Sequence, residues 1–343
     1  MDKVRENMII KLTDTFDECA MLYYYATIDE EVDNVRVTDY NKEKGRLNFY
    51  ESLFPVIDYF LGIKDIDESH LDEETISKIK GLFDSLDEEI EKDGLNSEEV
   101  RRAFLLLDIK GFKNLNFDLD LITPDNIGII IAKMVDVLIK KDKFTMLDPN
   151  FGVGNLAFTV LNNLDKDVDL IGIDNHALMA NVAVHKANLM QQDVEIFHQD
   201  ALEFLPSDID LVISDLATYD YYNDEYKSDL YNEGVRYFPY LAIEHYLKLE
   251  GDARYIYVID NNFFSQKGSE KLKKIIDETA SIKAFVALPE DMFLDKSKGK
   301  ALLILDKHPK DHKQIPIYML PSTKNKSAFL NTISDILNQI KPE

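Results

Sequence analysis

The segment LDPNFGVGNLAF, residues 147–158, joins a strand-like run to a helix-like run. Within it, Gly152-x-Gly154-x-x-Ala157 fits the G-x-G-x-x-G/A turn that holds nucleotide phosphates at a helix N-terminus. Asp148 ends the strand ahead of these glycines, where its carboxylate would repel an anionic pyrophosphate. The sulfonium and ammonium groups of S-adenosylmethionine are cations and favour such a carboxylate. The segment therefore predicts an S-adenosylmethionine site and disfavours an NAD site.

Two further carboxylates follow the next two strand-like runs. Asp174 ends LIGIDN, with Asn175 beside it, and its carboxylate can accept both hydroxyl hydrogens of a ribose. Asp200, in FHQDAL, can accept a hydrogen bond from an adenine amino group beside the apolar Ala201 and Leu202. Open α/β sheets bind ligands at the carboxyl ends of their strands, so the succession of carboxylates strengthens the prediction of a nucleoside site.

Strand-like and helix-like runs alternate after residue 120. The apolar runs are residues 144–147, 168–173, 194–197, 210–214, 254–259, 282–288 and 301–305, and helical patterns cover residues 125–140, 154–164, 175–190, 236–249 and 268–280. This alternation predicts a doubly wound, mostly parallel, seven-stranded Rossmann-like α/β sheet. The connection between the last two runs is too short for a parallel crossover, so we expect them to be antiparallel neighbours.

Residues 1–120 instead show apolar residues at helical spacing in four segments. Ser97, ahead of Glu98 and Glu99, is typical of a helix N-cap with acidic residues in the first turn. Cys19, the single cysteine, lies in the first helical pattern, where we expect it to be buried.

Charge and composition limit the classes of partner. The chain has 64 acidic and 39 basic residues, a net charge of −25, which repels nucleic-acid phosphates at long range. Residues 267–326 reverse the balance, with 13 basic and 8 acidic residues, and form either a nucleic-acid face or a solvated lysine-rich edge. A signal peptide and a membrane-spanning run are not recognisable, and one cysteine cannot build a disulfide framework, so we expect a cytoplasmic protein.

The order of these motifs resembles the class I S-adenosylmethionine-dependent methyltransferases. It resembles more closely the N6-adenine DNA methyltransferases of type I restriction modification subunits and of small stand-alone bacterial proteins. The resemblance covers residues 121–307, and its clearest motif is a Thr-Pro turn followed, 24 residues after the proline, by D-P-x-x-G-x-G-N. It implies cofactor contacts from Thr123, Pro124, Asp148, Pro149, Gly152, Gly154 and Asn155.

The resemblance also suggests the domain organisation. We expect a helical domain over residues 1–115 and a methyltransferase domain over residues 116–343. One departure lies in the glycine loop, where the family has a small residue and a cysteine and this chain has Asn150-Phe151. The bulkier pair should crowd the loop.

The catalytic motif departs further. In N6-adenine methyltransferases the fourth strand ends in [D/N]-P-P-[Y/F], where a side-chain oxygen and a backbone carbonyl accept the hydrogens of the amino group and the aromatic ring stacks on a flipped-out base. This chain has DLATY there, residues 215–219, without either proline and with the aromatic one position late. The resemblance implies that Asp215 and the Leu216 carbonyl accept the hydrogens, that Asp215 borders the cofactor, and that Tyr219 stacks. Alternatively, Asp215 only caps the loop and the tyrosine only packs.

Several functions stay open. The leading hypothesis is an S-adenosylmethionine-dependent N-methyltransferase acting on adenine N6 in DNA, or in RNA. The alternatives are a catalytically lapsed cofactor-binding protein with a protein partner, and a methyltransferase for protein amide nitrogens, which an acidic surface suits. A homo-oligomer is also possible, and a membrane partner is not expected. His308 and His312 are separated by Pro309 and lack a fixed acidic partner, so we expect no metal site.

Overall fold

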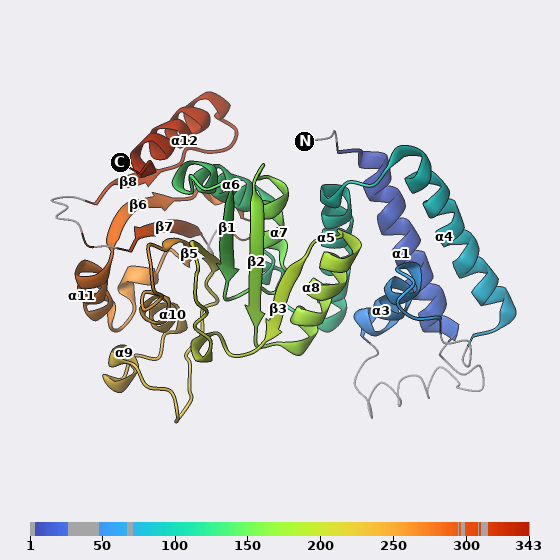
Figure 1. Ribbon diagram of the computed structural model, residues 1–343, viewed down its shortest axis with the longest axis horizontal. Helices are drawn as coiled ribbons and strands as arrows, with labels where there is room; N and C mark the ends of the chain where they lie inside the picture. Colours follow the sequence, from blue (N-terminus) through green and yellow to red (C-terminus); the bar gives the residue numbers. More distant parts are fainter. Residues whose placement is uncertain are drawn as a thin grey trace. The chain divides into compact units, whose positions relative to one another are not determined.

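The computed structural model (Figure 1) describes residues 4–26, 48–66, 71–293, 295, 299–307, 309 and 315–342. The chain forms two compact units. The first comprises Met1–Leu121 and Asn181–Asp193, and the second comprises Ile122–Ala180 and Val194–Glu343. The domain division between residues 115 and 116 stays a prediction.

Helices build the first unit, as its apolar spacing predicts. They are α1 (Glu6–Ala26), α3 (Phe49–Phe60), α4 (Glu73–Asp93), α5 (Ser97–Leu115), the 3-10 helix Leu119–Leu121 and the later part of α8 (Ala177–Leu189). Phe16 packs against Phe60, Phe83 and Phe104, with ring centroids 5.3, 5.4 and 5.2 Å away. Cys19 is fully buried beside this aromatic core, which confirms its expected burial.

The start of α5 corrects one expectation. Asn96, not Ser97, is the N-cap: its side chain accepts a hydrogen bond from the Glu98 N–H, and the Glu99 carboxylate accepts one from the Asn96 N–H. Asparagine caps as well as serine. The capping box also requires an acidic residue or glutamine three positions after the cap, and only Asn96 has one, because Val100 follows Ser97 at that distance.

A buried ion pair joins three helices of the first unit. Lys186 Nζ, on α8, lies 2.7 Å from Asp108 Oδ2, on α5, and the two side chains are 0% and 1% exposed. Tyr50, on α3, donates its hydroxyl hydrogen to Asp108 Oδ1 over 3.2 Å. Gly111 lies one turn further along α5 and leaves room for the Tyr50 ring, since a Cβ there would come within 2.5 Å of it. These contacts fix the spacing of α3, α5 and the later part of α8.

An eight-stranded sheet in the order β3-β2-β1-β4-β5-β7-β6-β8 forms the centre of the second unit. Its strands are β1 (Lys143–Asp148), β2 (Asp167–Asp174), β3 (Val194–His198), β4 (Leu211–Asp215), β5 (Arg254–Asp260), β6 (Ser281–Ala287), β7 (Lys300–Asp306) and β8 (Ile317–Met319). The first five strands pair in parallel, and β7 runs antiparallel to β5 and to β6. The seven apolar runs are therefore strands, and the antiparallel pairing predicted for the last two is confirmed.

The sheet has one strand more than predicted. β8 pairs in parallel with β6 at the sheet edge and has only three residues. Its Ile317 and Met319 are 70% and 78% exposed. The strand was not predicted because it is short and its apolar side chains lie outside the core, so its sequence contains no recognisable apolar run.

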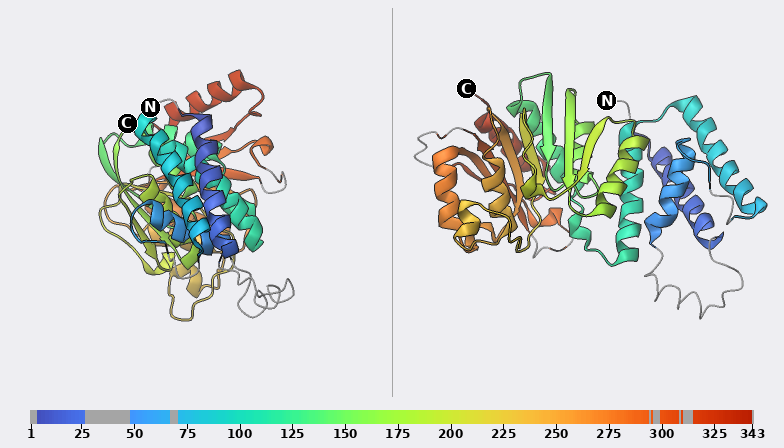
Figure 2. Two further views of the ribbon diagram at one scale, coloured as in Figure 1. Left: turned by 90° about the vertical axis from the view of Figure 1, so that its right-hand side faces the viewer. Right: turned by 60° about the horizontal axis from the view of Figure 1, so that its bottom comes forward.

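Helices cover both faces of this sheet (Figure 2). The helices of the second unit are α6 (Asp125–Leu138), α7 (Asn155–Asn162), the start of α8, α9 (Asp229–Asn232), α10 (Phe238–Tyr246), α11 (Ser269–Thr279), α12 (Lys326–Ile340) and the 3-10 helices Ala201–Glu203, Phe263–Ser265 and Glu290–Met292. The chain moves across the sheet in one direction from β1 to β2 and in the other from β4 to β5. Right-handed crossovers therefore place α7 and α10 on opposite faces.

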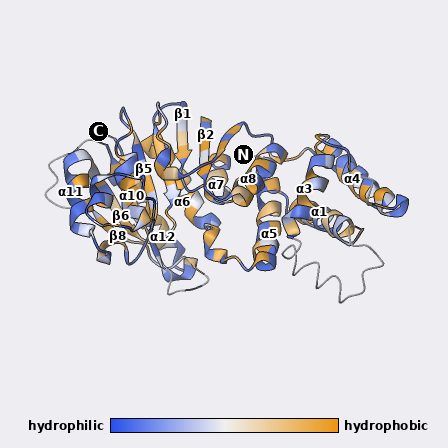
Figure 3. Cartoon of the chain, turned by 90° about the horizontal axis from the view of Figure 1, so that it is seen from below, coloured by the Kyte–Doolittle hydropathy of each residue, from blue (hydrophilic) through white to orange (hydrophobic). Residues whose placement is uncertain are grey.

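Hydrophilic and hydrophobic residues alternate along the helices of both units (Figure 3). In the described part of the chain, each helix is too short or too polar to cross a membrane.

The strand order reverses between β1 and β4, and this is where an open α/β sheet offers its ligand site. Asp148 and Asp215 are the last residues of these two strands. Because β7 is antiparallel to β5, the first residue of β7 lies beside the carboxyl ends of the parallel strands. Lys300 pairs there with Asp260, the last residue of β5. The topology thus gathers carboxylates and one lysine at the carboxyl ends of the parallel strands.

Candidate functional site

The glycine loop connects β1 to α7 and is tied to the end of β2. Gly152 and Gly154 have φ angles of 54° and 76°, which glycine adopts without strain. The Phe151 N–H donates to the Ile173 carbonyl over 2.9 Å, and the Gly152 N–H donates to Asp174 Oδ2 over 2.8 Å. The loop predicted from the sequence is therefore formed, with Asp174 as one of its supports.

Phe151 turns into the protein. It is 3% exposed and meets Phe158 edge-on, with ring centroids 5.3 Å apart. A Cβ on Gly172 would lie 2.4 Å from the Phe151 ring, and a Cβ on Gly154 would lie 2.9 Å from it. The bulk of Phe151, expected to crowd the loop, is therefore accommodated beside two glycines.

Asp148 is fully buried, and one of its oxygens lacks a protein partner. Oδ1 accepts a hydrogen bond from the Asn150 N–H over 3.1 Å, whereas Oδ2 has no hydrogen-bond partner within the described residues. Burial raises the pKa of the carboxyl to about 8, and the charges of Asp215 and Asp174 act in the same direction, whereas the Asn150 N–H and the nearby Ser214 hydroxyl oppose the shift. A cationic hydrogen-bond donor would satisfy this oxygen and favour its ionised form. This property fits the ammonium group of S-adenosylmethionine.

Asp174 is held by two backbone groups at the end of β2. Oδ1 accepts from the His176 N–H and Oδ2 from the Gly152 N–H, each over 2.8 Å. Burial raises the pKa of this carboxyl, and these two hydrogen bonds oppose the shift. Each oxygen keeps a second lone pair, so two ribose hydroxyls can still be accepted. The side chain of the neighbouring Asn175 is exposed.

Asp200 has a partner that the sequence analysis missed. Its Oδ1 accepts from the Leu202 N–H over 2.9 Å, and its Oδ2 accepts from the Tyr221 hydroxyl over 2.7 Å. Ala201 and Leu202 are buried beside it. An adenine amino group would have to share Oδ2 with Tyr221 or use the second lone pair of Oδ1. The aromatic-rich sequence after Tyr219 was the available signal for such a partner.

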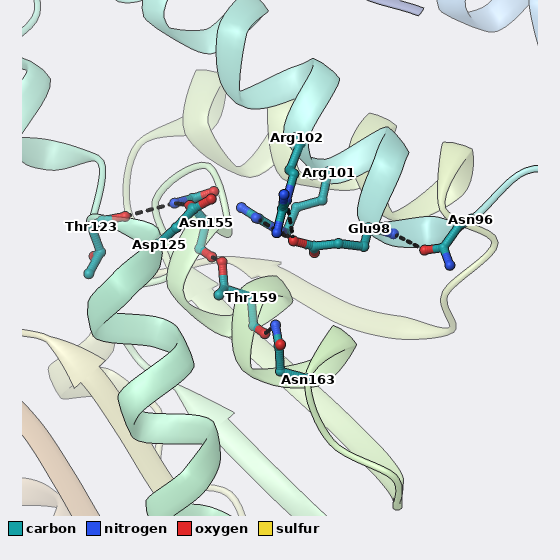
Figure 4. A network of polar contacts seen from close by, with 9 residues as sticks. All are labelled: Asn96, Glu98, Arg101, Arg102, Thr123, Asp125, Asn155, Thr159 and Asn163. Atoms are coloured by element: carbon teal, nitrogen blue, oxygen red, sulfur yellow. Dashed lines mark hydrogen bonds and ion pairs between the residues drawn. The ribbon is translucent and has the colours of Figure 1, made fainter. Parts of the chain in front are cut away.

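The Thr-Pro turn contacts both the glycine loop and the end of β4. Thr123 donates its hydroxyl hydrogen to Asp215 Oδ2 over 2.9 Å. Asn155 Nδ2 donates to the Thr123 carbonyl over 2.7 Å and to Asp125 Oδ1 over 3.1 Å (Figure 4). Pro124 is the N-cap residue of α6, and Pro149, directly after β1, is buried. The side chain of Asn155 therefore serves to join the turn to the loop.

Figure 4 also shows hydrogen bonds that extend along individual helices. The Thr159 hydroxyl donates to the Asn155 carbonyl over 2.6 Å, and Asn163 Nδ2 donates to the Thr159 carbonyl over 2.8 Å, along α7. In the first unit, the Glu98 carboxylate accepts from Arg101 and Arg102, also drawn there. These contacts connect successive turns within α7 and within α5.

The end of β4 lacks prolines but is held by other contacts. The Leu216 N–H donates to the Val258 carbonyl over 3.1 Å, which extends the pairing with β5 beyond Asp215. Tyr219 stacks on Phe238, with centroids 4.7 Å apart and planes at 14°, and is 38% exposed. Burial, followed by the charges of Asp200 and Asp174, raises the pKa of Tyr219. One face of the ring predicted to stack on a base is therefore already covered.

Lys300 is the site residue that the sequence analysis did not find. Its Nζ lies 2.7 Å from Asp215 Oδ1 and 2.8 Å from Asp215 Oδ2. The Asn261 N–H, in the loop after β5, donates to the carbonyl of the preceding Gly299 over 3.1 Å. The sequence did contain a signal for Lys300. If the apolar runs 282–288 and 301–305 are antiparallel, the residue before the second run lies beside the carboxyl ends of the parallel strands. His308 and His312 lie outside the described residues.

An open α/β sheet with acidic residues at its switch point defines the class of the second unit. Residues 120–336 match the family described as N-6 DNA Methylase, so the chain belongs to this family. The family and its structural neighbours are S-adenosylmethionine-dependent methyltransferases. The chain is 34% identical over 259 residues to the uncharacterized protein YtxK of Bacillus subtilis (strain 168), covering 72% of this chain and 78% of that protein.

Solved structures support the same fold. A Listeria monocytogenes protein assigned to the class I S-adenosylmethionine-dependent methyltransferases superposes with a TM-score of 0.79 at 25% identity, over 98% of this chain and 100% of that one. A type I restriction-modification methyltransferase subunit from Streptococcus thermophilus gives a TM-score of 0.58 at 13% identity, over 97% and 85% of the two chains. The first likeness extends over the helical region as well as the sheet.

Proposed function

We propose that this methyltransferase transfers a methyl group from S-adenosylmethionine to an exocyclic amino nitrogen, with adenine N6 in DNA as the leading acceptor and RNA as the second choice. The observation that carries the proposal is the position of Asp215. It ends β4 at the switch point, accepts a hydrogen bond from Thr123 of the Thr-Pro turn, and its charge raises the pKa of Asp148 at the end of the neighbouring strand β1. This arrangement supports the proposal, because the residues that would hold the acceptor and the cofactor lie at the same ends of neighbouring strands.

The cofactor supplies an electrophilic methyl group, and the chain supplies the groups that hold both reactants. Asp148 would face the ammonium group, Asp174 the ribose hydroxyls, and Asp200 with Ala201 the adenine. Asp215 and the Leu216 carbonyl would accept the two amino hydrogens of the acceptor. These hydrogen bonds concentrate electron density on the acceptor nitrogen and direct it towards the methyl carbon.

The test is transfer of tritiated methyl into fractionated DNA, RNA and protein, with Asp215→Ala beside wild type. We expect label in DNA, a loss of about 100-fold or more in the variant, and cofactor binding that is weaker but still measurable. Asp210→Ala is the matched control, since Asp210 precedes β4 at its other end and pairs with the exposed Lys141. Equal transfer by wild type and Asp215→Ala would refute the assignment.

A second candidate function is a cofactor-binding protein that acts on a protein partner without transferring methyl groups. Two observations favour it: Asp215 already contacts Lys300 with both oxygens, and Tyr219 is stacked on Phe238. Cofactor binding without label in any fraction would support this candidate. Label in protein alone would indicate an amide or amine of a protein as the acceptor, which the net charge of −25 suits better than DNA.

A further inference from the structure

The carboxylate of Asp215 is held from two sides by other segments of the chain. Lys300, from the start of β7, contacts both oxygens at 2.7 and 2.8 Å, and Thr123, from the Thr-Pro turn, donates to Oδ2 at 2.9 Å. The Lys300 and Asp215 side chains are 15% and 13% exposed. Because both side chains are largely buried, solvent competes little for either charge, and the ion pair limits rotation of the carboxylate.

These contacts replace what the turn has lost. In the family's motif two prolines stiffen the backbone after the acidic residue, and here Leu216 and Ala217 occupy those positions. A flexible turn would let the carboxylate rotate, and small displacements of an acceptor group are costly in catalysis. The ion pair constrains the side chain directly and leaves a lone pair of Oδ1 for an acceptor hydrogen.

Lys300 also changes the electrostatics of the cofactor site. The charges of Asp215 and Asp174 act on Asp148, so the three carboxylates share one electrostatic environment. The His176 imidazole, just after β2, and the His198 imidazole, at the end of β3, lower the pKa of Asp174. Lys300 offsets the negative charge nearest the acceptor. S-adenosylmethionine carries one positive charge more than its product S-adenosylhomocysteine, so a negative field favours the cofactor over the product.

We propose that Lys300 is a positioning residue of this site: it fixes the Asp215 carboxylate in place of the missing prolines, and it limits the preference of the site for the cationic cofactor over the neutral product. The proposal rests on the proposed function for the location of the cofactor. Its electrostatic part is measured by binding alone and does not require turnover.

The experiment compares wild type with Lys300→Met and Lys300→Arg. Calorimetry with S-adenosylmethionine and S-adenosylhomocysteine gives the ratio of the two affinities, which should rise about fivefold or more in Lys300→Met and stay near wild type in Lys300→Arg. In the methyl-transfer assay, Lys300→Met should lower kcat about tenfold or more, with Lys300→Arg retaining most of it.

Lys283→Met is the matched control. Lys283 is a buried lysine of the same sheet and lies 3.6 Å from Asp306, at the opposite end of β7 from Lys300. Its loss should leave the affinity ratio unchanged. An unchanged ratio in Lys300→Met would overturn the role of Lys300, whether or not methyl groups are transferred. A shifted ratio without transfer by wild type would refute the proposed function alone, and failure of wild type to bind either ligand would refute both.

Discussion

At the scale of single residues, Asp148 combines full burial, an oxygen without a protein partner and a pKa raised to about 8. Because the folded pKa lies above the ordinary value of 3.8, the ligand-free protein loses stability as pH rises from about 4 towards 8. A cationic ligand favours the ionised form. Cofactor binding should therefore release a proton at neutral pH and tighten as pH rises towards 8.

Asp148→Asn tests this linkage. The variant keeps the shape of the side chain but cannot ionise, so the ligand-free protein should melt at a higher temperature at pH 8 than wild type. Its affinity for S-adenosylmethionine should be about tenfold lower or worse, which corresponds to ~1.4 kcal/mol. Thermal denaturation and calorimetry between pH 6 and about 8.5 measure both. A cofactor affinity as high and as pH-dependent as that of wild type would contradict the role of Asp148.

Gly172 offers a second prediction at this scale. Gly172→Ala puts a methyl group 2.4 Å from the Phe151 ring and should cost about 1–3 kcal/mol of unfolding free energy. Combining it with Phe151→Ala should cost less than the sum of the two single changes, because the smaller residue makes room for the methyl group. Strict additivity in denaturant unfolding would show that the two residues do not compete for space.

At the scale of elements, the approach of α3 to α5 depends on Gly111, where a Cβ would lie 2.5 Å from the Tyr50 ring. Gly111→Ala should therefore destabilise the protein by about 1–3 kcal/mol. Gly81→Ala is the control: Gly81 is also helical, a Cβ there meets nothing within 4 Å, and the change should stabilise α4 by about 0.5–1 kcal/mol. Equal effects in denaturant unfolding would contradict the close packing of α3 on α5.

The ion pair between Asp108 and Lys186 makes a prediction for the same helices. Either Asp108→Leu or Lys186→Met alone leaves a buried charge without its partner and should cost about 3–5 kcal/mol. The double variant should recover most of that loss, since apolar replacements of a buried pair are often neutral or better. Chemical denaturation of the four proteins gives the coupling energy directly, and additive losses would contradict a direct interaction.

The sequence predicted those elements whose buried side chains repeat with a clear period. All seven apolar runs became strands, and burial is most complete in β5, where Tyr255 to Ile259 are at most 1% exposed. The edge strand β3 has no fully buried residue, so its apolar run was recognised by composition rather than by burial. β8 and α12 lie at the edge of the second unit and bury few residues, so their sequences carry a weaker signal. The contact between Asp215 and Lys300 joins positions 85 residues apart. It could not be predicted without knowing the order of the strands in the sheet.

At the scale of the whole molecule, the net charge of −25 should set how the protein meets nucleic acid. A protein that binds duplex DNA through many phosphate contacts loses about 10³–10⁵ in affinity between 50 and 200 mM salt. Here salt also screens long-range repulsion, so the loss should be less than about tenfold. Anisotropy titrations of a labelled duplex across this range test it, and a steep loss would point to a basic binding face.

The composition of the first unit has a consequence for synthesis on the ribosome. Residues 122–180 are made before Asn181–Asp193, the last segment of that unit, is available. At about 5–20 residues per second, this delay lasts several seconds. During that time Lys186 has not been synthesised, so Asp108 lacks its ion-pair partner. The N-terminal helices therefore lack one of their buried contacts while the first strands of the sheet emerge. The N-terminal part of the nascent chain cannot finish folding first, and the two units must mature together.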